Sequence, residues 1–187
     1  MIPERPVFLD ACVLYPPVMR ALILGAAEAG LFTPAWSARV LAEWRIAVAR
    51  KEGPEAALAV DAAQARLREA FPEAEAAPDP DTEAALVPLL PDPADAHVLA
   101  GARAAGAGTL LTLNLRDFPR RLMAGEGIAA RHPDGVLWEL ASHAPERFAA
   151  LVRAATGTGD PAAQRRALKR ARLPRLGKAM EAGAGGP

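Results

Sequence analysis

The sequence predicts an α/β protein whose parallel sheet is covered by helices on both faces. Short apolar runs at 7–9 and 109–112 are typical of buried strands, and the first ends directly before Asp10. Segments with helical spacing separate these runs, and strands that alternate with helices favour a parallel sheet. After residue 133 only helical patterns follow.

The first third of the chain contains two helical segments around a second short apolar run. Pro16 and Pro17 begin a helix that ends at Gly30. The run at 31–34 is consistent with a second strand. Ser37 is a helix N-cap, because apolar residues at helical spacing follow it: Val40, Leu41, Trp44 and Val48.

The middle of the chain leads to the strand at 109–112. We expect an Ala-rich helix over 56–70 and a loop over 72–81, whereas 84–90 fits either a strand or a helix. Asp92, followed by proline, is an N-cap with proline at the first helical position. This predicts a helix that continues to about residue 105.

The last third of the chain predicts helices over about 134–142, 145–155 and 161–172. Its final residues are rich in glycine and alanine, which is typical of a disordered terminus. We therefore expect three parts, which are an α/β domain over 1–133, a helical extension over 134–180 and a disordered tail over 181–187.

The composition is that of a globular protein. The 187 residues include 22 basic and 22 acidic residues, so the chain is not a uniformly basic nucleic-acid coat protein. The single cysteine, Cys12, cannot form an internal disulfide. The apolar stretch at 21–32 is interrupted by Glu28 and is shorter than the roughly 20 residues of a membrane span. We expect a soluble, cytoplasmic protein that does not associate with membranes.

Four acidic residues stand where the predicted elements would bring them together. Asp10 and Asp117 each follow a strand, Asp95 begins the helix before the second strand, and Glu43 lies on a helix. Ligands of parallel sheets bind beyond the carboxyl ends of the strands. Carboxylates gathered there repel one another, and Mg²⁺ or Mn²⁺ would offset that repulsion. Such cations promote phosphodiester hydrolysis.

Each acid also has a purely structural interpretation. Glu43 fits a solvated helix face, and Asp92 fits an N-cap alone. Asp95 would interact favourably with the helix dipole, and Asp117 could cap a turn. Asp10 is harder to explain in this way, because it ends a buried apolar strand. The functional prediction therefore depends on the whole set.

Four sequence motifs resemble the PIN-domain nucleases and, within them, the VapC-type toxins of bacterial toxin–antitoxin pairs. The resemblance covers about residues 6–133. The motifs, in chain order, are FLDA at 8–11, SARVLAE at 37–43, PDPADAHVLA at 91–100 and LTLNLRDFP at 111–119.

This resemblance implies a three-layer α/β/α sandwich with a central parallel sheet and RNA cleavage that depends on Mg²⁺ or Mn²⁺. By position it implies four catalytic, metal-binding acids: Asp10, Glu43, Asp95 and Asp117. Asp92, Thr112 and Asn114 match further polar positions of the site. The resemblance also implies a cognate antitoxin and a homodimer.

The stretch 161–178 contains seven basic residues and no acidic one. Such a stretch is either a solvated helix face or a surface that contacts RNA phosphates. The candidate RNA-contacting residues are Arg165, Arg166, Lys169 and Arg170.

Two other functions fit parts of the same pattern. A PIN-like protein could hold RNA or a partner without cutting it, since a fold does not fix a function. An aspartyl phosphatase would also use Mg²⁺, but it requires a second aspartate two residues after the first, where this chain has Cys12.

Overall fold

The computed structural model describes residues 4–184, which form two compact units. The sheet unit comprises 4–15 and 33–131, and the helical unit comprises 16–32 and 132–184. The division of the chain into domains at residue 133 stays a prediction.

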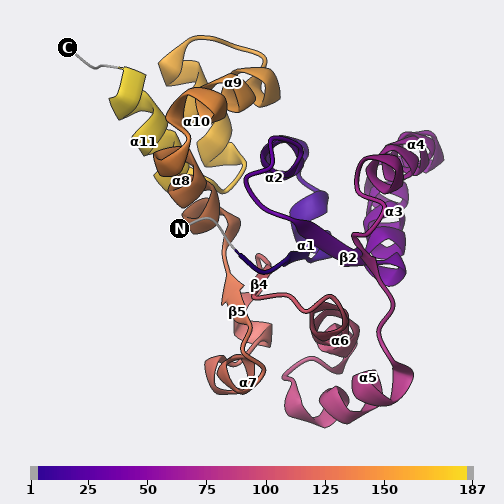
Figure 1. Ribbon diagram of the computed structural model, residues 1–187. Coiled ribbons are helices and arrows are strands. Elements are labelled where there is room, and N and C mark those ends of the chain that lie inside the picture. The colour runs from indigo at the N-terminus through magenta and orange to yellow at the C-terminus, as the bar shows by residue number, and fades with distance from the viewer. Residues whose placement is uncertain (1–3, 185–187) are drawn as a thin grey trace. The chain divides into compact units, whose positions relative to one another are not determined.

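The sheet unit is built on five parallel strands in the order β3-β2-β1-β4-β5. Figure 1 labels β2, β4 and β5 of this sheet. The strands are β1 (Val7–Leu9), β2 (Pro34–Ser37), β3 (Glu75–Ala76), β4 (Thr109–Leu111) and β5 (Ala129–Arg131). This sheet, flanked by helices and followed by C-terminal helices, confirms the predicted fold class.

Helices of the sheet unit cover both faces of the sheet. The chain runs from β2 to β3 through α3 (Ala38–Glu52) and α4 (Pro54–Ala70). It then returns from β3 to β4 in the opposite direction, through α5 (Pro80–Leu86) and α6 (Ala96–Ala104). Since such crossovers are right-handed, α3 and α4 lie on one face and α6 lies on the other. Helix α6 packs across β1, β2, β3 and β4.

Two short strands and one strand boundary differ from the sequence prediction. The second strand begins at Pro34, because Leu31 still bonds through its amide to Ala26 O in the turn that ends the preceding helix. Strand β3 lies inside the expected loop and is aligned by the Trp36 N–H, which donates to Ala74 O at 2.9 Å. Strand β5 and the preceding helix α7 (Arg120–Gly125) were not predicted.

The sheet core is closely packed between β1 and α6. The Phe8 side chain is fully buried and lies against Gly101 of α6. A Cβ atom at Gly101 would come within 2.5 Å of Phe8 Cζ. Glycine therefore allows the helix backbone to approach the central strand this closely.

The helical unit contains α2 (Pro17–Glu28), α8 (Pro133–His143), α9 (Pro145–Thr156), α10 (Pro161–Arg170) and α11 (Pro174–Ala184). The first four occupy predicted segments. The helix expected over 161–172 ends early because Arg172 adopts a positive φ of 60° and the Leu173 N–H bonds to Leu168 O. Helix α11 then begins where the Asp134 carboxylate accepts bonds from the Arg175 and Leu176 amides, both at 2.9 Å.

Helix α11 includes residues 181–184, the first part of the expected disordered tail. Residues 185–187 of that tail lie outside the described residues. Among the helices of the described chain, none is both long enough and apolar enough to cross a membrane.

Candidate functional site

The candidate site lies at the carboxyl ends of β1 and β4, where the direction of the strand connections reverses. Asp10 follows β1 and caps α1 (Ala11–Leu14), and Thr112 follows β4. Both side chains are buried, and the Thr112 hydroxyl donates to Asp10 Oδ2 at 2.7 Å. This bond joins the two strand ends at the position where parallel sheets commonly bind ligands.

Further donors fix this corner. The Cys12 thiol donates to Asp10 Oδ2 at 3.0 Å, and Cys12 Sγ accepts from the Leu113 amide at 3.1 Å. The Asn114 amide donates to Thr112 Oγ1 at 3.0 Å. Each carboxylate oxygen of Asp10 therefore faces a donor, since Oδ1 accepts from the Cys12 amide. The result is a carboxylate held in one orientation.

Cys12 supports Asp10 and is not a nucleophile. Burial, together with the negative charge of Asp10 and the bond to it, raises the pKa of the Cys12 thiol far above its usual range. The thiol therefore stays protonated, and a thiol reacts as a nucleophile only when ionised. The sequence alone gave no signal for this supporting role, because the cysteine has no recognisable partner within its local sequence.

Asp95 is the carboxylate most affected by its surroundings. Burial is the largest cause that raises its pKa from 3.8 to about 6, and the negative charges of Asp10, Asp117 and Asp92 contribute to the same rise in that order of effect. His97 acts in the opposite direction. The structure thus brings three predicted carboxylates within electrostatic reach of Asp95, although they come from separate elements.

The other polar positions lie at the exposed margin of this group. Asp92 is exposed, and its Oδ1 accepts from the Ala94 amide at 2.9 Å, as an N-cap should. Asn114 is also exposed and precedes the short 3₁₀ turn η3 (Leu115–Asp117), which carries Asp117.

Glu43 is not part of the same electrostatic group. Its carboxylate accepts from His97 Nε2 at 2.9 Å and lies 3.5 Å from Arg39 Nε. The charge of Glu43 is not among the causes of the Asp95 shift. His97, on α6, is buried and joins Glu43 of α3 to the other face of the sheet. Sequence reasoning did not assign it this positioning role, because its burial is a tertiary property.

The donor chemistry fits a hard divalent cation, since these carboxylates offer the oxygen ligands that Mg²⁺ and Mn²⁺ prefer. Within residues 4–184, however, no three acidic, histidine or cysteine side chains come close enough together to hold one ion. The structure therefore supports the type of donor and does not display an assembled coordination sphere.

The candidate RNA-contacting residues lie on α10 in the helical unit. Arg165 forms an ion pair with Glu181, and Arg166 lies 3.9 Å from Asp160 Oδ2. Lys169 and Arg170 have no acidic partner within the described part of the chain. Their contact with RNA stays a prediction.

Comparison with known proteins identifies the family. A family model described as PIN domain matches residues 6–116, a stretch that includes Asp10, Glu43, Asp95 and Thr112. No curated protein and no solved structure matches the chain. PIN domains are generally nucleases. Because the matched segment covers more than half of the sequence, this chain belongs to the PIN-domain family.

Proposed function

We propose that this protein is a metal-dependent endoribonuclease that hydrolyses RNA phosphodiesters. The observation that carries the proposal is the approach of Asp10 and Asp117 to Asp95 at the carboxyl ends of β1 and β4. Membership of a family whose domains are generally nucleases supports the hydrolytic reaction. The RNA substrate is inferred from the resemblance of the four motifs to VapC-type toxins.

Asp10, Asp95 and Asp117 would hold the cation in this proposal, with Glu43 as a fourth acid. Asp10 is preorganised for this role by the Thr112 hydroxyl and the Cys12 thiol. His97 and Arg39 orient the Glu43 carboxylate. When bound, Mg²⁺ or Mn²⁺ supplies Lewis-acid activation of a phosphodiester and of the water that hydrolyses it.

The surroundings of Asp95 give a physical reason for cation binding. Its raised pKa reflects the cost of keeping a partly buried carboxylate ionised, to which the negative charges of three other acids add. A divalent cation would offset that cost. The neighbouring polar groups of Asp92, Thr112 and Asn114 would then position RNA or water at the margin of the site.

The biological role that we propose is that of the toxin of a toxin–antitoxin pair. It follows from the same resemblance, which also implies a cognate antitoxin and a homodimer. Arg165, Arg166, Lys169 and Arg170 would contact RNA phosphates, and Lys169 and Arg170 offer charges that no described acid neutralises.

The proposal predicts RNA cleavage that depends on added cation. The wild-type protein, purified without metal, is incubated with a random-sequence single-stranded RNA library in Mn²⁺, in Mg²⁺ or in EDTA, and new 5′ ends are sequenced. We expect defined new ends with either cation and none in EDTA. Intact RNA in all three samples would favour a binding module without cleavage, and cleavage that persists in EDTA would exclude the metal-dependent reaction.

A further inference from the structure

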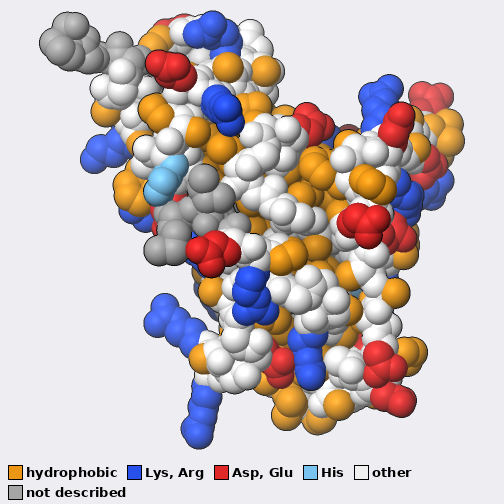
Figure 2. Space-filling view, viewed as in Figure 1, with side chains coloured by type: hydrophobic (Ala, Val, Ile, Leu, Met, Phe, Trp, Pro, Cys, Tyr) orange, Lys and Arg blue, Asp and Glu red, His pale blue; other side chains and the backbone are white. Residues whose placement is uncertain are grey.

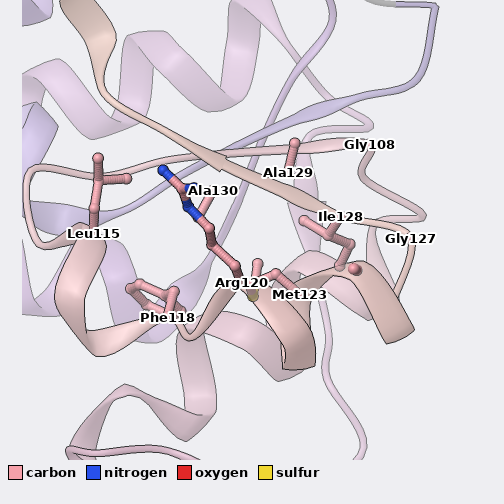
Figure 3. A pocket seen from close by; sticks show the side chains of 10 residues that line it. Gly108, Leu115, Phe118, Arg120, Met123, Gly127, Ile128, Ala129 and Ala130 are labelled. Carbon is pink, nitrogen blue, oxygen red and sulfur yellow. The ribbon is translucent and has the colours of Figure 1, made fainter.

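A second feature of the sheet unit is an apolar cavity of about 500 Å³. It lies between η3, α7 and β5 (Figure 3). Its lining includes Leu115, Phe118, Arg120, Met123, Ile128 and Ala130. This volume is within the range of about 300–1,000 Å³ that is typical of small-molecule sites.

One side of the cavity adjoins the group of acids in the chain. Leu115 and Phe118 line it, and Asp117, which lies between them in the sequence, acts electrostatically on Asp95. The short turn η3 therefore presents apolar side chains to the cavity and a carboxylate to the candidate site. A ligand group in the cavity would lie close to a phosphodiester at the acids.

Arg120 gives the cavity a positive charge. Its side chain crosses the cavity and carries the guanidinium toward the gap between Leu115 and Ala130 (Figure 3). Arg120 has no acidic partner within residues 4–184, and neither do the exposed Arg116 and Arg121 nearby in the chain. Figure 2 shows basic side chains that extend into solvent around α7.

We propose that this cavity binds one unstacked nucleobase of single-stranded RNA. This assignment rests on the ribonuclease function proposed above. The apolar walls of the cavity suit the faces of a base. The side chain of Leu115, which lines the cavity, is 43% exposed, so a planar ring can lie against it. A guanidinium plane stacks on bases and also pairs with phosphate. The uncompensated charge of the exposed Arg116 complements an adjacent phosphate.

This occupant explains how RNA could approach an acidic site. The carboxylates around Asp95 repel a polyanion, whereas Arg116 and Arg120 attract it. A base held in the cavity would fix which phosphodiester reaches the acids. The cavity would therefore determine the base preference at one position near the cut.

The test is nucleotide binding by NMR on the full-length protein in EDTA, so that no cleavage is needed. The methyl signals of Leu115, Met123 and Ile128 are followed during titration with AMP, CMP, GMP, UMP and, as a control without a base, ribose 5-phosphate. Ile46 provides a reference signal, because it is exposed on α3 and does not line the cavity. We expect at least one nucleotide to shift the three cavity methyls, while ribose 5-phosphate does not.

Arg120→Ala and Arg121→Ala form a matched pair, since both remove one exposed arginine of α7 and only Arg120 lines the cavity. Arg120→Ala should weaken the nucleotide affinity about tenfold, as expected for loss of one stacking contact. Arg121→Ala should change it by no more than about twofold. Unmoved cavity methyls with all four nucleotides, or equal effects of the two variants, would overturn the proposal.

The nucleotide titration and the RNA-cleavage assay together separate the two proposals. Nucleotide binding in the cavity of a protein that never cleaves RNA would retain the base site and reject the ribonuclease. Cleavage of RNA by a protein whose cavity binds no nucleotide would retain the ribonuclease and reject the base site.

Discussion

Asp95→Asn is expected to lower RNA cleavage by at least about 100-fold and, at the same time, to stabilise the metal-free protein above pH 6. The loss of cleavage follows because asparagine removes one anionic oxygen donor from the proposed cation site. The gain in stability follows because asparagine also removes a charge that burial and three neighbouring carboxylates disfavour. Asp95 makes no capping bond at the start of α6, so the substitution breaks no such bond.

The stability effect has a defined pH dependence. The folded protein raises the pKa of Asp95 from 3.8 to about 6, so the folded state binds this proton more tightly than the unfolded state. The contribution of Asp95 to the stability of the wild type therefore falls as the pH rises from about 4 to 6. The full shift corresponds to about 3 kcal/mol, which solvent screening of this half-buried group reduces to about 1–2 kcal/mol.

Thermal unfolding of both proteins in EDTA, at pH 4 and pH 7.5, measures this effect. At pH 7.5 the variant should unfold about 4 °C above the wild type, and at pH 4 the two should agree closely. Asp81→Asn is the matched control, because Asp81 is exposed on α5 outside the group of acids. A variant that is less stable than the wild type at pH 7.5 would contradict the conclusion that the folded protein disfavours the charge of Asp95.

Gly101→Ala is expected to destabilise the sheet unit by about 2 kcal/mol. The added Cβ would lie 2.5 Å from Phe8 Cζ and 2.9 Å from Cε2, inside the fully buried contact between α6 and β1. Overpacking of this kind costs up to about 3 kcal/mol, and the higher helix propensity of alanine recovers about 1 kcal/mol. Chemical denaturation of the wild type and variant measures the difference.

A second substitution tests whether the clash is the cause. Leucine at position 8 lacks the ring atoms Cζ and Cε2, so the Phe8→Leu protein has room for an alanine at position 101. We expect the double variant to be no less stable than Phe8→Leu alone, since neighbouring substitutions are not additive. Equal costs of Gly101→Ala in both backgrounds would show that the effect arises elsewhere.

The sequence predicted the elements that have strong local signals. The run at 7–9 is entirely apolar, Ser37 bonds to the Val40 amide as an N-cap, and Asp92 caps its turn. Strands β3 and β5 have only two and three residues, and their side chains are partly exposed, so they lack a hydrophobic pattern. Both strands form by pairing with β2 and β4, which is a tertiary interaction.

The same distinction applies to the candidate site. The positions of Asp10, Asp95 and Asp117 at strand ends and at a helix start were sufficient to expect their approach. The bond from Thr112 to Asp10 spans 102 positions in the chain, and the contact between His97 and Glu43 joins two helices. Local sequence cannot reveal such pairs, because they depend on how α3, α6 and the strands pack.

The central claim is that Asp10, Asp95 and Asp117 serve one cation site, and calorimetric titration of Mn²⁺ tests it most directly. The titration compares the wild type with Asp10→Asn at pH 7, each first shown to be folded. We predict saturable binding by the wild type and an affinity at least about tenfold weaker in the variant. No binding by the wild type, or equal affinities of the two proteins, would contradict the claim.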